Sequence, residues 1–314
     1  MRQANFVKLL KPKALFPGAT VGIVAPSSWA KDARLRRGLA WLVKTGFGVK
    51  LFLSPKLKYG FLSGPDEVRA KLFNQAFADP ELDAVICARG GYGALRMLDK
   101  IDFDLIGKNP KIFVGFSDIT AIHLALYKKT GLCSFHGPMA ADFGTAYNRH
   151  NLLKVLNSKS PFGKVSFPKG MRPKFMRPGV ATGPLLGGNL SLVVKLFGTP
   201  YQPSLDGAIL FLEDISEYPH RIDGYLAQLR LAGVFDQISG LILADFKDCE
   251  RPPRASFTMP LKRIFQDFFR HAPFPVALNF PFGHSKNKFT LPLGVRATLD
   301  SKNKSLVLEE AGVV

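Results

Sequence analysis

The stretch IFVGFSDITAIHLALYKK, residues 112–129, decides how the surrounding chain folds. Its first four residues are an apolar run typical of a buried strand, and a helix is expected from about residue 119 to residue 129. Between them, Ser117 lies on a turn that would lift its hydroxyl out at the carboxyl end of a sheet, near helix N–H groups able to stabilise an oxyanion. The turn resembles a G-x-S-x-G elbow, with Asp118 in place of the second glycine. The alternative is that Ser117 or Asp118 only caps the helix.

The chain before this stretch alternates between strand and helix patterns. Short β-branched or apolar runs predict strands at residues 20–25, 48–53 and 84–87, and amphipathic patterns predict helices at residues 30–44 and 65–77. Strands that alternate with helices indicate a mostly parallel sheet with helices on both faces. We therefore expect an α/β fold with an N-terminal domain over residues 1–157 that carries Ser117.

The second half of the chain has a different character. Residues 158–184 are rich in Pro, Gly and Lys without sustained periodicity, which predicts a linker or a long crossing connection. After it, a helix is expected at residues 222–232, and strands are expected at residues 208–212, 240–244, 276–279 and 305–308. These elements predict a smaller, β-rich C-terminal domain over residues 185–314.

Composition excludes several classes of protein. Among the 314 residues, 46% are hydrophobic, which allows a sizeable core, but no run of 18 apolar residues predicts a membrane span. The N-terminal residues are interrupted by Lys and Pro and do not form a signal peptide, so we expect a cytoplasmic protein without a membrane partner. Cys87, Cys133 and Cys249 are widely spaced and form no C-x-x-C pair, so we expect neither a metal nor a redox site. No cofactor is indicated.

The charge is strongly basic, with a formal net charge of +19. Residues 143–205 contain no acid, and the nine basic residues there are Arg149, Lys154, Lys159, Lys164, Lys169, Arg172, Lys174, Arg177 and Lys195. Such a field attracts anions, but the stretch lacks a nucleic-acid motif, so no nucleic-acid partner is expected. We hypothesise that Lys169, Arg172, Lys174 and Arg177 face a cleft for an anionic substrate. The alternative is a solvated basic surface.

A second glycine-rich turn follows the predicted strand at residues 84–87. ARGGYGA, residues 88–94, does not fit G-x-G-x-x-G and is not a phosphate-binding loop of the Gly-Lys-Ser/Thr type. Its glycines allow close approach of the backbone, and it should lie at the same end of the sheet as Ser117. It is therefore a candidate second oxyanion donor, with an ordinary tight turn as the alternative.

A nucleophilic serine needs a base and a group that orients the base. Among six histidines, His284 lies in PFGHSKNK at the end of an apolar run, where small neighbours leave it free to face a cleft. Among the carboxylates, Glu213 ends the run AILFLE, with Asp214 and Glu217 as close competitors. Periodicity alone does not choose between these partners.

Eight motifs in order carry a family resemblance over nearly the whole chain. They are IVAPSS (23–28), FLSGPDEVRAKLFNQAFADP (61–80), ARGGYGALR (88–96), VGFSDITAIHLAL (114–126), FHGP (135–138), LLGGNLSLV (185–193), LFLEDISEYPHRIDGYLAQLRLAG (210–233) and FPFGHSKNKFTLPLG (280–294). With them the chain resembles the LD-carboxypeptidases of the serine-triad type, which include the microcin C self-immunity peptidases.

The resemblance implies a role for each matching residue. Ser117 would be the nucleophile, His284 the base and Glu213 the triad acid. The backbone N–H groups of Gly91 and Asp118 would form the oxyanion hole. The motifs also imply substrate-binding residues, namely Gly90, Tyr92 and Asn189.

The resemblance further implies a homodimer and a reaction that needs no metal. The expected reaction is hydrolysis of an L,D-amide bond that releases terminal D-Ala from the murein tetrapeptide. The alternatives are an immunity peptidase that cleaves a peptidyl-nucleotide antibiotic, or a peptide-binding relative without turnover. Two positions depart from the family pattern, Ser285 after the expected base and Gly224 in RIDGYL, and either could alter the cleft.

Overall fold

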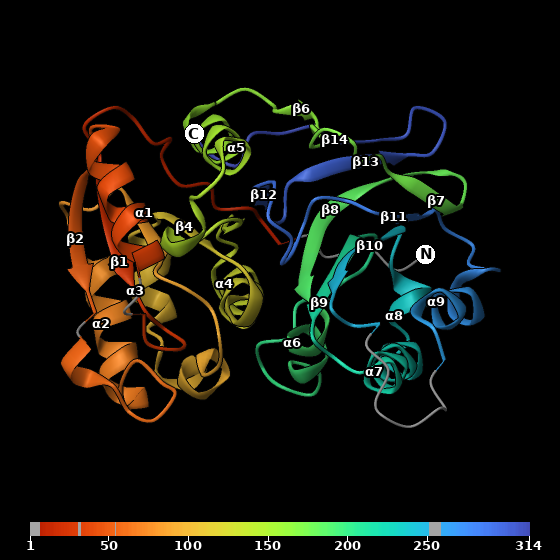
Figure 1. Cartoon of the computed structure of the whole chain (residues 1–314), viewed down its shortest axis with the longest axis horizontal. Helices are drawn as coiled ribbons and strands as arrows, with labels where there is room; N and C mark the ends of the chain where they lie inside the picture. Colours follow the sequence, from red (N-terminus) through yellow and green to blue (C-terminus); the bar gives the residue numbers. More distant parts are fainter. Residues whose placement is uncertain (1–6, 31–32, 54, 251–258) are drawn as a thin grey trace.

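The computed structural model describes residues 7–30, 33–53, 55–250 and 259–314, and it contains two β-sheets that lie side by side (Figure 1). The first sheet is 6-stranded, in the order β12-β5-β4-β3-β1-β2. Strands β1 to β5 run parallel, and β12 pairs antiparallel with β5. The strands are β1 (Thr20–Val24), β2 (Gly48–Phe52), β3 (Ala84–Cys87), β4 (Ile112–Gly115), β5 (Phe135–His136) and β12 (Leu291–Pro292). The middle strands β3 and β4 are apolar and wholly buried because helices cover both faces of the sheet.

Helices pack around the first sheet. They are α1 (Ala33–Lys44), α2 (Asp66–Ala78), α3 (Phe103–Lys108), α4 (Thr120–Thr130) and α5 (Ala146–Asn157), with short 3₁₀ helices η1 (Pro55–Leu57), η2 (Ala94–Lys100), η3 (Ser117–Ile119) and η4 (Ala140–Asp142). Helix α2 begins after Pro65 with two acids in its first turn, which suits the positive end of the helix dipole. Helix α4 contacts β8 and α6, so it lies between the two halves of the molecule (Figure 1).

The second sheet is 8-stranded, in the order β6-β14-β13-β8-β9-β10-β11-β7. Its four central strands, β8 to β11, are parallel, and antiparallel strands extend it on both sides. The strands are β6 (Gly163–Lys164), β7 (Lys174–Arg177), β8 (Val180–Asn189), β9 (Ile209–Ile215), β10 (Gly240–Lys247), β11 (Val276–Leu278), β13 (Arg296–Asp300) and β14 (Ser305–Leu308). Its helices are α6 (Leu190–Lys195), α7 (Pro219–Leu231), α8 (Val234–Gln237) and α9 (Leu261–Phe269).

The predicted α/β fold, with a parallel N-terminal sheet and a C-terminal sheet domain, is confirmed. The segment 158–184, interpreted from sequence as a linker, does cross between the sheets, but it also contributes β6, β7 and the start of β8. The first two are short strands at the two edges of the second sheet, where Pro and Lys are tolerated because one side of the strand needs no pairing. Residues 1–6 of the predicted N-terminal domain and residues 31–32 of the predicted first helix lie outside the described residues.

The two sheets share their apolar cores. One cluster of buried side chains joins Val85 and Phe113 of the first sheet to Leu210 and Leu241 of the second. The chain also returns from the second sheet to the first, because β12 pairs with β5 at Leu291. The segment between β11 and β12 therefore crosses from one sheet to the other and is held at both ends.

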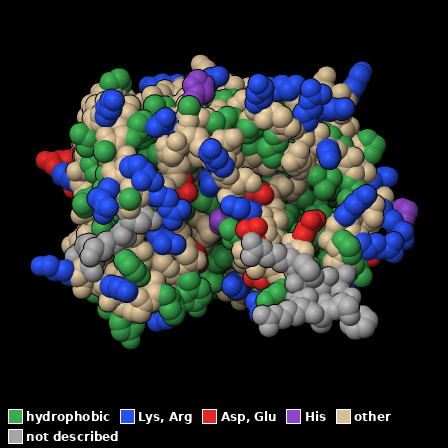
Figure 2. All heavy atoms as spheres, viewed as in Figure 1, with side chains coloured by type: hydrophobic (Ala, Val, Ile, Leu, Met, Phe, Trp, Pro, Cys, Tyr) green, Lys and Arg blue, Asp and Glu red, His purple; other side chains and the backbone are tan. Residues whose placement is uncertain are grey.

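Three further features bear on the expectations from composition. Within the described residues, no helix is long and apolar enough to cross a membrane. All three cysteines are buried and free. Basic side chains are spread over most of the face in Figure 2, and few acidic ones accompany them.

Two helical glycines allow a test of the packing. An added Cβ at Gly38 in α1 would lie 1.8 Å from the carbonyl oxygen of Ala140, whereas one at Gly224 in α7 would meet nothing within 4 Å. Alanine favours a helix over glycine by about 1 kcal/mol, so Gly224→Ala should raise the free energy of unfolding by roughly that amount. Gly38→Ala should instead lower it by about 1–3 kcal/mol through overpacking. Urea unfolding of both variants measures this, and equal shifts would contradict the packing of α1 on η4.

Candidate active site

Ser117 stands two residues after the end of β4, at the carboxyl end of the first sheet. Its φ is 65°, a left-handed conformation that is strained for a residue other than glycine. Such a turn lifts the side chain out of the sheet and points it toward the next helix, as in a nucleophile elbow. A Cβ at Gly90 would lie 3.1 Å from the Cβ of Ser117, so a larger residue at position 90 would crowd the serine.

His284 and Glu213 complete a hydrogen-bonded chain with this serine. The Nε2 of His284 lies 3.0 Å from the Oγ of Ser117, and its Nδ1 lies 2.6 Å from Oε2 of Glu213. Glu213 is 0% exposed near the end of β9, and His284 lies on the segment that crosses between the sheets. Gly283 has a φ of 125°, and a Cβ there would sit 2.8 Å from Oε2 of Glu213, so glycine is needed for this approach.

The electrostatics favour Glu213 as the partner of the imidazole. Burial by itself would lower the pKa of His284, but the charge of Glu213 and its hydrogen bond outweigh burial, and the pKa lies above its ordinary value of 6.5. Asp214 points elsewhere, to the side-chain amide of Asn189 at 2.9 Å and the backbone N–H of Ser191 at 3.0 Å. Burial and the charge of Glu213 raise the pKa of Asp214 to about 6.

The remaining candidates from sequence lie elsewhere. Glu217 pairs with Arg221 at 3.6 Å, so of the three candidate carboxylates it is Glu213 that contacts His284. His123 is buried and bonds the carbonyl of Gly115 at 2.9 Å, and burial lowers its pKa to about 4. The other histidines bear no contact with the serine: His136 is buried, and His150, His220 and His271 are exposed.

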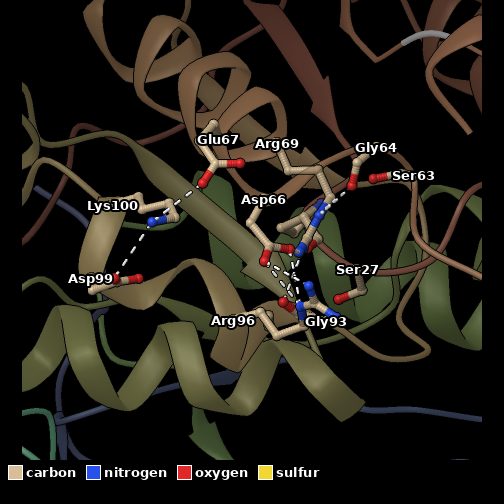
Figure 3. Close-up of polar contacts among 12 residues, drawn as sticks. Ser27, Ser63, Gly64, Asp66, Glu67, Arg69, Gly93, Arg96, Asp99 and Lys100 are labelled. Carbon is tan, nitrogen blue, oxygen red and sulfur yellow. Dashed lines mark hydrogen bonds and ion pairs between the residues drawn. The ribbon is translucent and has the colours of Figure 1, made fainter. Parts of the chain in front are cut away.

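The glycine-rich turn at residues 89–93 is held beside the serine by the buried side chains of Asp118 and Arg69. Sequence reasoning missed Arg69, and it considered Asp118 only as a helix cap or for its backbone N–H. The carboxylate of Asp118 accepts hydrogen bonds from Oγ of Ser27 at 2.6 Å and from the backbone N–H of Ala94 at 2.8 Å. The guanidinium of Arg69 donates to the carbonyl of Gly93 at 3.0 Å (Figure 3). The turn therefore has a fixed position relative to Ser117.

Arg69 also links this turn to two other loop segments, through Gly64 and Pro26. It donates to the carbonyl of Gly64 at 3.0 Å and to that of Pro26, and it pairs with Asp66, which also binds Arg96 at 2.9 Å (Figure 3). An arginine three residues after an aspartate on an amphipathic helix is the sequence signal, but an exposed ion pair gives the same pattern. Burial of the arginine, which only the fold decides, distinguishes the two.

A cavity of about 290 Å³ opens in front of the serine. Its lining includes Ser117, His284, Gly90, Gly91 and Phe116, together with one acid and four basic residues, namely Asp142, Arg34, Arg89, Lys247 and Lys288. Two of the expected substrate-binding residues do not line it. Tyr92 is 49% exposed and packs on Phe61, and Asn189 is 3% exposed and caps α6 with its side chain.

The cavity is basic, as the hypothesis of a cleft for an anionic substrate requires, but its basic residues are not the ones expected. None of the nine basic residues in the acid-free stretch lines it. Lys174 and Arg177 lie on β7 at the edge of the second sheet, and Arg177 donates to the carbonyl of Ala272 at 3.2 Å. The hypothesis that this stretch faces the site is therefore wrong for this cavity. The cations come instead from separate segments that the fold brings together.

The two departures from the family pattern also lie outside the cavity lining. The backbone N–H of Ser285 donates to the carboxylate of Asp245, which anchors the loop after His284. Gly224 faces open space on α7. No group of three potential ligand side chains that could hold a metal ion occurs among the described residues.

Fold and site together define a two-domain α/β protein with a hydrogen-bonded Ser–His–Glu arrangement, which can activate a serine for attack on a carbonyl group. The LD-carboxypeptidase N-terminal domain matches residues 21–137, and the LD-carboxypeptidase C-terminal domain matches residues 182–299. The chain belongs to the LD-carboxypeptidase family.

Known proteins resemble the chain over most of its length. A probable murein peptide carboxypeptidase of Bacillus subtilis is 39% identical over 307 residues, 96% of this chain and 95% of that protein. The microcin C7 self-immunity protein MccF of Escherichia coli is 30% identical, over 93% of this chain and 94% of that protein.

Solved structures of related proteins have a similar fold over most of the chain. A muramoyltetrapeptide carboxypeptidase from Oxalobacter formigenes has a TM-score of 0.80 at 30% identity and covers 92% of this chain and 97% of its own. MccF in complex with glutamyl sulfamoyl guanosine has a TM-score of 0.89 at 26% identity and covers 97% of this chain and 100% of its own.

The choice of Glu213 over its neighbours can be tested without a substrate. A serine-reactive fluorophosphonate should label Ser117 in the native protein. Glu213→Gln should slow labelling by about 10³-fold or more, because the amide neither stabilises the imidazolium nor holds the correct tautomer. Glu217→Gln, which keeps the His284 contact, serves as the matched control and should change the rate little. The reverse ranking in folded variants would show that the wrong carboxylate has been chosen.

The pH dependence of labelling reports on the same pair. A general base must be neutral, so the rate should rise with pH, with a midpoint above 6.5 because Glu213 raises the pKa of His284. In Glu213→Gln the raising influence is lost and burial remains, so the midpoint should move to lower pH while the plateau falls. A midpoint that does not move would show that Glu213 does not set the protonation of His284.

Proposed function

We propose that the chain is a serine-type LD-carboxypeptidase that releases terminal D-Ala from the murein tetrapeptide. The observation that carries the proposal is the hydrogen-bonded chain from Glu213 through His284 to Ser117, with its serine open to a basic cavity. The names of the Bacillus and Oxalobacter relatives support murein peptides as the substrate class.

The geometry supports a double-displacement mechanism. His284 Nε2 takes the proton of Ser117 as the hydroxyl attacks the scissile carbonyl, and the same nitrogen then gives it to the leaving amine. Water, activated by His284, hydrolyses the acyl-enzyme and returns the serine. Glu213 holds the imidazole through Nδ1–H and stabilises its charged form.

The oxyanion would be bound by backbone donors on both sides of the serine. We assign this role to the N–H groups of Asp118 and Gly91, of which Gly91 lines the cavity. The Asp118 carboxylate accepts a hydrogen bond from the N–H of Ala94, and Arg69 donates one to the carbonyl of Gly93. These bonds fix the positions of the two N–H donors relative to each other before substrate binds. Donors that need no reorganisation stabilise a developing charge most effectively.

Charge favours an anionic peptide as the substrate. Four basic residues and one acid line the cavity, and a murein tetrapeptide carries several carboxylates. A cavity with a net positive lining raises the local concentration of such a ligand. A cytoplasmic location and a homodimer stay predictions from sequence and resemblance.

The second candidate is an immunity peptidase that cleaves a peptidyl-nucleotide antibiotic. The likeness to MccF, whose structure is solved with glutamyl sulfamoyl guanosine, favours it. A non-catalytic binding protein is the third candidate, and the intact Ser–His–Glu hydrogen bonds argue against it.

Mass spectrometry of products separates these candidates. The native chain, incubated with murein tri-, tetra- and pentapeptides and with glutamyl sulfamoyl guanosine, should release D-Ala from the tetrapeptide. Ser117→Ala should lower kcat by roughly 10³-fold or more without unfolding the protein. The exposed Ser204→Ala is the matched control and should leave kcat unchanged. Cleavage of the nucleotide conjugate in place of the tetrapeptide would support the second candidate, and no cleavage of any probe would support a binding protein.

A further inference from the structure

The four basic residues around Ser117 differ in their surroundings. Lys288 is 6% exposed, whereas Arg34 and Lys247 are exposed and Arg89 is half-buried. An exposed cation is solvated and can be tolerated anywhere on a surface. A buried cation at the wall of a cavity needs a reason.

The ammonium group of Lys288 has few partners inside the protein. It donates to the carbonyl of Ser285 and lies over the ring of Phe116, 5.2 Å from its centroid. Asp142, Asp245 and Glu213 are near enough to act on its charge, but none of them forms an ion pair with it among the described residues. Burial lowers the pKa of Lys288, and the attraction of the three nearby carboxylates does not make up for the loss of solvation.

A ligand that supplies a negative charge would compensate for this burial. A charge buried without a partner destabilises a protein, and a carboxylate bonded to it removes most of that penalty. The open side of Lys288 is the cavity itself, because the rest of the side chain is enclosed. The missing anion should therefore come from whatever occupies the cavity.

The proposed mechanism places the C-terminal carboxylate of the substrate near Lys288. The amine that leaves must lie next to His284 Nε2, which protonates it, and in a carboxypeptidase the terminal carboxylate is only two bonds away from that amine. The imidazole of His284 lies 5.0 Å from the ring of Phe116, and Nζ of Lys288 lies 5.2 Å from the same ring. Both groups thus lie against the Phe116 side chain and line the same cavity, and the charge of Lys288 acts on His284.

We propose that Lys288 binds the C-terminal carboxylate of the residue that is released, and so restricts hydrolysis to the last amide bond of the peptide. The inference rests on the proposed function, since it assigns a subsite to that reaction. A charge-assisted hydrogen bond to the carboxylate would favour substrates with a free C-terminus over amidated ones by about 10- to 100-fold in kcat/KM.

The test compares the murein tetrapeptide with the same peptide carrying a C-terminal amide, by mass spectrometry of the D-Ala or D-alaninamide released. The native chain should prefer the free acid. Lys288→Met should lower kcat/KM for the acid by about 10- to 100-fold and leave the amide nearly unchanged, so the preference disappears. Lys288→Arg should keep part of it. Lys286→Met, at an exposed position two residues earlier, is the matched control and should keep all of it.

Each other outcome has a distinct meaning. If Lys288→Met lowers kcat/KM equally for the free acid and the amide, while fluorophosphonate still labels Ser117 at the native rate, Lys288 does not select the carboxylate and the inference is overturned. Retention of the native preference in Lys288→Met overturns it as well. If Lys288→Met also loses labelling of Ser117, the two substrates are compared in Lys288→Arg and Lys288→Gln instead. A native preference for the free acid in both variants would likewise overturn the inference. Failure of the native chain to cut the tetrapeptide would instead overturn the proposed function, and the subsite with it.

Discussion

The hydrogen-bonded chain from Glu213 to Ser117 depends on how the two sheets meet. Ser117 follows β4 of the first sheet, Glu213 belongs to β9 of the second, and His284 lies on the segment that crosses between them. Separations of 2.6 Å and 3.0 Å tolerate little relative movement, because hydrogen bonds weaken steeply with distance and angle. The rest of the structure can be understood as a means of keeping these three side chains in place.

Apolar packing supplies most of that rigidity. Buried side chains of both sheets share continuous clusters, and α4, which begins just after Ser117, contacts the second sheet directly. An interface of this kind resembles the interior of a single domain and opposes hinge motion. The pairing of β12 with β5 adds a second connection, close in sequence to His284.

Buried polar groups then set the protonation of His284 and the position of the glycine-rich turn. Burial removes competing water from Glu213, so its charge acts strongly on His284 and raises the pKa of the imidazole. Asp118 and Arg69 use buried hydrogen bonds to fix the glycine-rich turn beside the serine. The cavity that results is lined by cations from four separate segments, and Lys288 is the most deeply buried of them.

Short-range sequence patterns were enough to predict the local elements of this protein. The strand, Ser117 turn and helix at residues 112–129 and the mostly parallel pairing of the N-terminal strands could be predicted from it, because turn chemistry and hydrophobic periodicity are short-range properties. Residue patterns left Glu213, Asp214 and Glu217 open as partners of His284, and the family resemblance was needed to choose Glu213, which the fold brings into contact with the imidazole. Only the packing of distant segments shows that Asn189 caps a helix, and that Lys288 rather than the basic stretch at residues 143–205 faces the cavity. These outcomes depend on contacts between segments that are far apart in the sequence, and no local sequence pattern encodes such contacts.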